Sequence, residues 1–200
     1  FARVVPNGID LVDWPFCPRG DATAAWMGRI TPAKGPHLAA QAAKLAGIPL
    51  TLYGTIEDQA YFDKEIAPLL AENVQYGGLL HGADLTNAIA CTSVLLFTPL
   101  WDEPFGLAAI EAMACGLPIA AVENGAIREV AGDVARYAGA DAGELANALK
   151  EASTIPRTAA RKRVERLFKL SQMLSEYVGL YARAIEAVGE GFDVPDLEAF

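Results

Sequence analysis

Short apolar runs alternate with longer, Ala-rich segments along most of the chain. The short runs carry almost no charge, as is typical of strands buried on both faces of a parallel sheet. The longer segments place apolar side chains at the spacing of a helix face. This alternation predicts an α/β fold in which a Rossmann-like parallel sheet has helices on both faces. The expected strands are 24–27, 50–53, 74–76, 94–97, 119–122 and 135–137, and the expected helices are 36–46, 58–70, 84–91, 106–115, 127–131 and 142–151.

Glycine and proline occur where several of these helices are expected to end. Gly47, Gly116 and Gly132 each follow an expected helix, and Pro49 and Pro118 come shortly after two of those ends. Glycine accepts the left-handed conformation that closes many helices, and proline cannot continue one. These residues therefore support the boundaries that the apolar pattern predicts.

The composition changes after Pro156. Six of the sixteen lysines and arginines fall within 157–169, together with a single acid, Glu165. We expect this basic segment to form a solvated helical face, with docking onto an anionic membrane surface as the alternative. Apolar residues at helical spacing predict a further helix over 170–188. The chain is thus expected to comprise a domain over 1–156, C-terminal helices over 157–188 and a tail over 189–200.

The 200 residues are 52% hydrophobic and carry a formal net charge of −9. This apolar content is sufficient for a compact core and argues against disorder. The negative charge argues against a nucleic-acid-binding protein, which needs a basic surface along the phosphates. No apolar run reaches the roughly 18 residues of a membrane-spanning helix. We therefore expect a cytoplasmic protein, peripheral at the inner membrane surface if the basic segment docks there.

The three cysteines, Cys17, Cys91 and Cys115, lie far apart in the sequence, without the paired spacing of a zinc site or a disulfide framework. We expect reduced and mostly buried thiols. The chain begins with Phe1, and residues 1–5 have the composition of a strand. These features predict that the sequence is a piece of a longer protein.

The segment 99–118 carries the most specific chemistry. It follows the strand expected at 94–97, so it lies at the carboxyl edge of the sheet, where open α/β folds bind ligands. Glu111 is the only charge between Phe105 and Pro118, and a carboxylate in such apolar surroundings needs hydrogen-bond donors. Glu103 lies just ahead of the helix, and Gly106 lets an anion approach the free amides of the first turn. A nucleotide-sugar fits this layout, with ribose at Glu111, diphosphate at the amides and the transferred sugar near Glu103.

A second loop, Gly28–Gly35, follows another expected strand. Arg29 and Lys34 are expected at the same sheet edge as Glu103, where they would neutralise a leaving diphosphate. Neither loop contains the glycine patterns of a dinucleotide-binding site or a P-loop. Taken alone, two loop cations are ordinary solvated charges, but together with the glutamates they are expected ligands.

These residues resemble a known family. Val-Pro-Asn-Gly-Ile-Asp at 5–10, Gly-Arg-x4-Lys-Gly at 28–35, and Glu-x7-Glu at 103–111 within Glu-Pro-Phe-Gly…Glu-Ala-Met-Ala-x-Gly-x-Pro are similar to glycosyltransferase family 4, the glycosyl transferases group 1. The resemblance spans about residues 4–185. It is similar to the C-terminal, donor-binding half of the two-domain GT-B architecture only.

The resemblance implies a retaining transferase that uses a UDP-, GDP- or ADP-linked sugar and needs neither metal nor cofactor. It implies that Arg29 and Lys34 bind the diphosphate, Glu111 the ribose and Glu103 the donor sugar. The N-terminal domain, which would supply the acceptor site, is absent, so the piece alone is expected to transfer poorly. Further donor contacts are implied at Phe105, Gly106, Leu107, Ala108, Gly78, Leu79, Leu80 and Gly125. Many members have Gly-Gly where Gly125 and Ala126 stand.

Other interpretations stay open at this stage. Within enzymes they are a GT-B sugar-nucleotide epimerase and a phosphorylase-like relative, for which no pyridoxal-binding lysine is evident. Outside enzymes, the alternative is a non-catalytic nucleotide-sugar-binding module. His37 and His81 are expected to be a helix-start and a loop residue, and Trp101 is the tryptophan nearest to the expected sugar site.

Overall fold

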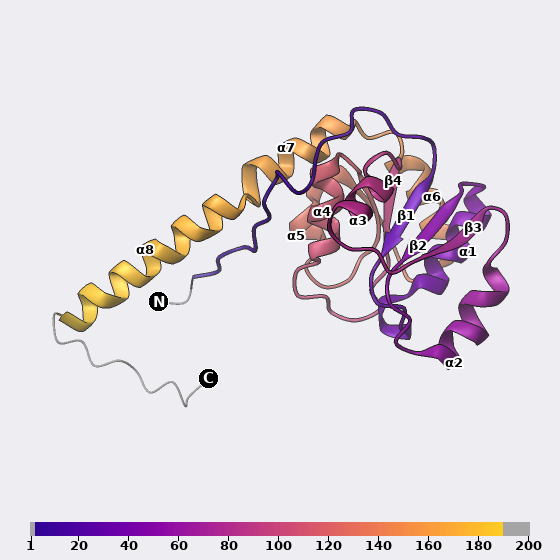
Figure 1. The fold of residues 1–200 in the computed structure, drawn as a ribbon, viewed down its shortest axis with the longest axis horizontal. Coiled ribbons are helices and arrows are strands. Elements are labelled where there is room, and N and C mark those ends of the chain that lie inside the picture. Colours follow the sequence, from indigo (N-terminus) through magenta and orange to yellow (C-terminus); the bar gives the residue numbers. More distant parts are fainter. Residues whose placement is uncertain (1–2, 190–200) are drawn as a thin grey trace.

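The computed structural model describes residues 3–189, and within them six strands form one parallel sheet (Figure 1). The strand order is β3-β2-β1-β4-β5-β6, which is the order of a classic Rossmann sheet. The prediction is confirmed, although β3 and β6 continue past the expected ends. The strands are β1 (Ala24–Met27), β2 (Leu50–Tyr53), β3 (Val74–Gly78), β4 (Val94–Phe97), β5 (Ile119–Val122) and β6 (Ala135–Ala138).

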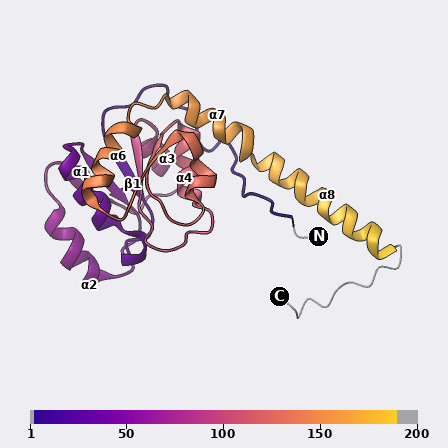
Figure 2. The same cartoon turned by 180° about the vertical axis from the view of Figure 1, so that it is seen from behind.

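Helices cover both faces of the sheet (Figures 1 and 2). Successive strand residues point to opposite faces, so Leu95 and Phe97 of β4 enter one core and Val94 and Leu96 the other. This explains why β1, β4 and β5 have apolar residues at every position. The first core packs against α3 (Gly82–Ala90), α4 (Leu107–Cys115), α5 (Ile127–Ala131) and α7 (Arg157–Leu167), and the second against α1 (Pro36–Ala46) and α6 (Ala142–Ala152).

The segment expected as one helix over 58–70 is instead irregular. It contains a short α2 (Gln59–Tyr61), a π-helical turn (Phe62–Ile66) and a 3-10 turn (Ala67–Leu69). Pro68 has no amide hydrogen to donate within a helix, and its ring clashes with the preceding turn. The prediction of one continuous α-helix was therefore wrong, although the segment consists of three consecutive helical turns of different type.

The expectation of a solvated basic face is wrong for three arginines of α7. Their guanidinium groups donate to carbonyl oxygens at the C-terminal ends of α3, α4 and α5, where helices leave acceptors unpaired and the dipole favours a cation. These contacts attach α7 to the domain. The other two cations of α7, Lys162 and Arg166, are exposed. Arg157 donates to Cys17, Ala90, Thr92 and Cys115, Arg161 to Trp14 and Ala114, and Arg163 to Glu129 and Val130.

The helix α8 (Leu170–Gly189) projects away from the domain, with the N-terminal segment running beside its start (Figures 1 and 2). Residues 3–5 are not a strand, so that expectation was wrong where the structure describes it. The segment pairs instead with the junction of α7 and α8: the Ile9 amide donates to the Phe168 carbonyl over 2.9 Å, and the Leu170 amide donates to the Ile9 carbonyl over 2.9 Å. The tail expected over 189–200 lies outside the described residues from 190 onward.

The cysteines also differ from expectation. Cys115 is buried, but Cys17 is half-buried and Cys91 is exposed, because Cys91 immediately follows the end of α3 on the surface. No helix among residues 3–189 is both long enough and apolar enough to cross a bilayer.

Candidate functional site

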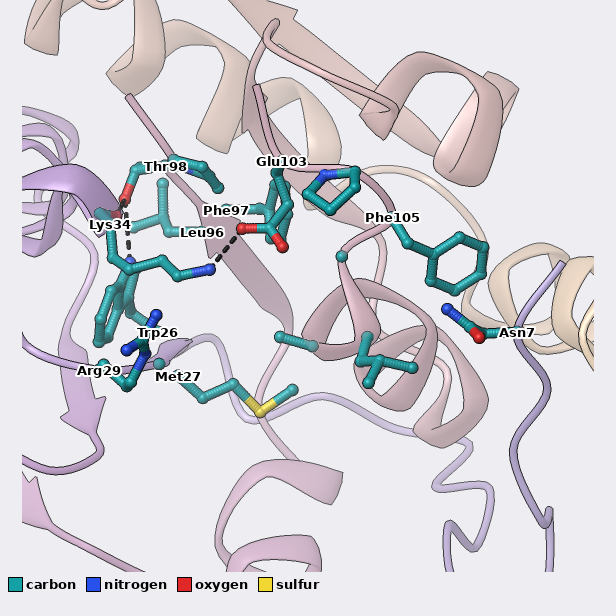
Figure 3. Close-up of a pocket in the computed structure, with 16 residues that line it drawn as sticks. Asn7, Trp26, Met27, Arg29, Lys34, Leu96, Phe97, Thr98, Glu103 and Phe105 are labelled. Atoms are coloured by element: carbon teal, nitrogen blue, oxygen red, sulfur yellow. Dashed lines mark hydrogen bonds and ion pairs between the residues drawn. The ribbon is translucent and has the colours of Figure 1, made fainter. Parts of the chain in front are cut away.

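Two adjoining cavities open at the carboxyl edge of the sheet, beside β1 and β4. Figure 3 shows the larger of the two. One has a volume of about 540 Å³ and the other about 230 Å³. Both are lined by residues 27–29 at the end of β1 and by Ala108 of α4. The strand order reverses between β1 and β4, and open α/β sheets bind ligands at such a switch point.

The loop after β1 is fixed by the end of β4. Thr98 is buried, and its hydroxyl accepts a hydrogen bond from the Trp26 indole over 2.9 Å. The same hydroxyl oxygen lies 3.0 Å and 2.9 Å from the carbonyl oxygens of Lys34 and Gly35. Gly35 has φ +63, and a Cβ there would lie 2.3 Å from the Thr98 carbonyl oxygen. This close approach places the Lys34 side chain in the larger cavity.

Glu103 and Lys34 form an ion pair in the larger cavity (Figure 3). Their side chains are only 13% and 20% exposed, so solvent screens this pair less than a surface pair. The Trp101 indole also donates to Oε2 of Glu103, over 3.0 Å, and its ring centroid lies 5.2 Å from the Lys34 ammonium. Both donors use Oε2, and Oε1 makes no hydrogen bond to residues 3–189. Oε1 is therefore free to accept from a ligand.

The helix α4 begins beside this ion pair. Gly106 has φ +91, and a Cβ on it would lie 2.8 Å from the Phe97 ring, so the chain needs glycine at this turn. Among residues 3–189, no side chain caps the start of α4, and the first amides of a helix have no intrahelical acceptor. Phe105, Gly106, Leu107 and Ala108 line the larger cavity. The geometry provides amide donors and the positive end of a helix dipole for an anion.

Glu111 lines the smaller cavity from the second turn of α4, next to Leu79 and Leu80. It is half-buried, and its carboxylate makes no hydrogen bond or ion pair with the described part of the chain. Burial raises the pKa of the Glu111 carboxyl above its ordinary value. A carboxylate in this position gains stability from a ligand that donates hydrogen bonds.

Arg29 borders both cavities, but its guanidinium pairs with Glu57 over 3.2 Å. The two side chains are 63% and 41% exposed. Such exposed ion pairs contribute at most about 1 kcal/mol to the free energy of folding. The guanidinium can therefore turn toward an anion in the cavities at little cost.

Every predicted site residue except Gly78 and Gly125 lines one of the two cavities. Gly78 ends β3, where its carbonyl accepts from the Gly54 amide over 2.9 Å. Gly125 lies behind the site: a Cβ there would lie 2.3 Å from the Glu103 carbonyl oxygen, and the Ala126 amide donates to that oxygen over 2.9 Å. The turn at 125–126 thus supports the Glu103 loop from outside the cavities.

Sequence reasoning missed Thr98 and Glu57. Thr98 directly follows a buried strand, which was a usable signal, whereas nothing near Glu57 in the sequence indicated its pairing with Arg29. His37 and His81 agree with the expectation for them: His37 is in the first turn of α1, where its Nδ1 lies 2.5 Å from the Tyr61 hydroxyl, and His81 precedes α3. Among residues 3–189, no group of three or more His, Cys, Asp or Glu side chains has the arrangement to hold a metal ion.

The fold and the geometry of the site define a Rossmann-like α/β domain with two adjoining cavities at its topological switch point. The sequence profile described as glycosyl transferases group 1 matches residues 17–173. The chain therefore belongs to the glycosyl transferases group 1 family.

Known relatives agree with this family. The chain is 31% identical over 161 residues to a D-inositol 3-phosphate glycosyltransferase of Mycobacterium avium, covering 72% of the chain and 38% of the relative. It is 31% identical over 205 residues to an MMP alpha-(1->4)-mannosyltransferase of Mycolicibacterium hassiacum, covering 93% of the chain and 49% of the relative. The chain thus spans less than half the length of these relatives.

Solved structures share the fold. A glycosyltransferase involved in avilamycin A biosynthesis, AviGT4, superposes with a TM-score of 0.82 at 24% identity, covering 92% of this chain and 59% of that one. HepE of Anabaena, solved in complex with UDP-glucose, gives a TM-score of 0.76 at 20% identity, covering 90% and 57% of the two chains.

Proposed function

We propose that the chain is the C-terminal, donor-binding half of a retaining GT-B glycosyltransferase of family 4, and that it binds a nucleotide-diphosphate sugar. The half-buried Glu111 carboxylate, without a protein partner among the described residues, carries this proposal most directly. Two ribose hydroxyls supply the donors that it lacks. The UDP-glucose complex of HepE, which shares the fold, is consistent with a donor of this class.

The diphosphate would lie between the start of α4 and the Lys34 loop. The free amides of Leu107 and Ala108 and the helix dipole favour its negative charge. Lys34 has three N–H donors, so it can keep its bond to Glu103 while donating to a phosphate oxygen. Arg29 adds a second cation by leaving Glu57.

The donor sugar would lie next to Glu103, whose Oε1 is free to accept a hydroxyl proton. As the glycosidic bond to the diphosphate breaks, negative charge grows on the leaving phosphate. Lys34 and the first residues of α4 already line the cavity proposed for that phosphate, and preorganised donors of this kind commonly lower a barrier by several kcal/mol. Arg29 would join them after leaving Glu57. Retention of configuration and independence of metal are proposed on the family resemblance.

A second domain, which would bring the acceptor, is proposed to pack against α8. The chain spans less than half of its relatives' length, and α8 carries a row of exposed apolar side chains. Such a row is costly in water and is typical of an interface. Its members are Leu174, Tyr177, Val178, Tyr181 and Ile185, which are 39–73% exposed.

Docking of the basic segment 157–169 onto an anionic membrane surface would involve few of its cations. Arg157, Arg161 and Arg163 donate to carbonyl oxygens of the domain itself. Lys162 and Arg166 are the exposed cations that remain in α7. Each would contribute about 1 kcal/mol to the free energy of binding to an anionic membrane.

A thermal-shift panel of UDP-, GDP- and ADP-sugars tests the proposal. A ligand at about 100 times its dissociation constant stabilises the native state by about 2.7 kcal/mol, or roughly 5–10 °C in a domain of this size. We expect one nucleotide class to raise the melting temperature of the wild type and of Lys44→Ala, an exposed cation of α1, but to raise that of Lys34→Ala much less. No shift with any sugar nucleotide would refute the proposal.

A further inference from the structure

Cys17 and Cys91 lie together at the edge of the sheet opposite to the candidate site. They are separated by 74 positions in the sequence, yet their sulfur atoms are 2.9 Å apart. Cys91 comes shortly before the start of β4, so it is at the amino edge, whereas the two cavities lie at the carboxyl edge. Cys91 is exposed and Cys17 is half-buried, so small molecules in solvent can reach the pair.

The backbones of both cysteines are held in place. The Cys17 amide donates to the Cys115 carbonyl over 3.1 Å, and the Cys91 carbonyl accepts from the Asp21 amide over 2.9 Å. The Arg157 guanidinium joins the two segments, since it donates to the Cys17 carbonyl on one side and to the Ala90 and Thr92 carbonyls flanking Cys91 on the other. The sulfurs are therefore kept close by contacts that do not involve the thiols.

We propose that Cys17 and Cys91 form a site of reversible disulfide formation, oxidised by exchange with a small-molecule disulfide. This inference is independent of the proposed donor site. The bond needs the sulfurs to approach to about 2.05 Å, which is a movement of less than about 1 Å.

The exchange balances without any further reactant. The Cys17 thiolate attacks one sulfur of the small disulfide, whose S–S bond breaks to release one thiolate. Cys91 then loses its proton to solvent and attacks the Cys17 sulfur, which breaks the mixed disulfide and releases the second thiolate. The protein loses two electrons and two protons, and the oxidant becomes two thiols.

The surroundings favour Cys17 as the first nucleophile. The hydrogen bond between the two sulfurs lowers the pKa of Cys17, and the nearby Arg157 charge acts in the same direction. The same hydrogen bond raises the pKa of Cys91. A thiolate is the reactive species in exchange.

Glutathione redox buffers provide the test. The chain is equilibrated at a series of ratios of reduced to oxidised glutathione, free thiols are blocked, and the product is identified by intact mass and peptide mapping. We expect an intramolecular Cys17–Cys91 link in the wild type and in Cys115→Ala, which keeps the pair. Cys91→Ser should instead accumulate a glutathione adduct at Cys17.

Comparison with the unfolded chain separates native geometry from chance pairing. The link should form with an equilibrium constant about 100-fold or more greater in buffer than in denaturant, since the fold holds the sulfurs together. The oxidised chain should melt about 5–10 °C higher than the reduced one. Glutathione adducts without the link, or equal constants in buffer and denaturant, would overturn the proposal.

Discussion

The indole nitrogen of Trp101 donates a hydrogen bond to Oε2 of Glu103 over 3.0 Å, on the same oxygen that pairs with Lys34. Glu103 is thereby oriented by two donors from different loops. Trp101 is 43% exposed, so its ring is not needed to fill the core. The relationship indicates that Trp101 positions the carboxylate that we assign to the donor sugar.

Trp101→Phe removes this donor and keeps an aromatic ring near Lys34. A hydrogen bond of this kind contributes about 1 kcal/mol, so we expect a nucleotide-sugar to bind about 3–10-fold more weakly. The free nucleoside diphosphate, which lacks the sugar, should bind within about twofold of wild type, and the melting temperature should change by less than about 2 °C. Calorimetric titration of both ligands measures the difference, and equal losses for the two would exclude a positioning role for Trp101.

Thr98→Val tests how the Lys34 loop is fixed. The substitution keeps the shape of the side chain but leaves the buried Trp26 indole without its acceptor. An unsatisfied buried donor costs about 1–3 kcal/mol, so the free energy of unfolding should fall by that amount in urea melts. Thr51→Val in β2 is the matched control, because the Thr51 hydroxyl makes no hydrogen bond to residues 3–189. Similar stabilities of the two variants would contradict this role for Thr98.

The strands were predictable because their apolar runs are short, uncharged and bounded by turn residues. Residues 1–5 have a similar composition, yet residues 3–5 form no strand. The N-terminal segment is held instead at Ile9, whose amide donates to the Phe168 carbonyl at the α7–α8 junction. Composition does not distinguish a sheet strand from an extended segment held elsewhere. Composition likewise could not show that Arg157 is held by the domain, because its acceptor at Thr92 is 65 positions away in the sequence.

The part of the candidate site that depends on where strands end could be predicted from the sequence. Residues following β1 and β4 had to meet at one edge, so Arg29, Lys34 and Glu103 were expected together. The pairing of Lys34 with Glu103 and of Arg29 with Glu57 depends on side-chain rotamers and on contacts across 69 and 28 positions. Apolar periodicity contains no information about either pair.

Arg157→Ala should destabilise the domain strongly. The guanidinium satisfies carbonyl oxygens at the ends of α3 and α4, and its loss leaves several half-buried acceptors unpaired. We expect a fall of about 3 kcal/mol or more in the free energy of unfolding. Lys162→Ala, an exposed position on the same helix, should stay within about 0.5 kcal/mol of wild type. Comparable effects at the two positions in urea denaturation would show that α7 is attached in another way.

Glu111→Gln should stabilise the unliganded domain at neutral pH. Burial raises the pKa of Glu111 in the folded state above the ordinary value, so ionisation of this side chain opposes folding. That cost is complete above the folded pKa and disappears as the pH falls to the unfolded pKa, because the folded state takes up its proton first. We expect the variant to melt about 1–3 °C higher than wild type at pH 7.5. The advantage should vanish near pH 4, and an advantage independent of pH would contradict the assigned cause.

Glu111 is assigned to the ribose of a sugar nucleotide, and calorimetric titration of Glu111→Ala measures its contribution to binding. The matched control is Glu72→Ala, an exposed carboxylate at the opposite edge of the sheet. We predict that the nucleotide-sugar found in the thermal-shift panel binds the control with wild-type affinity and binds Glu111→Ala at least about 30-fold more weakly, as loss of charge-assisted hydrogen bonds would produce. Equal affinity of Glu111→Ala and wild type would exclude Glu111 as the ribose ligand.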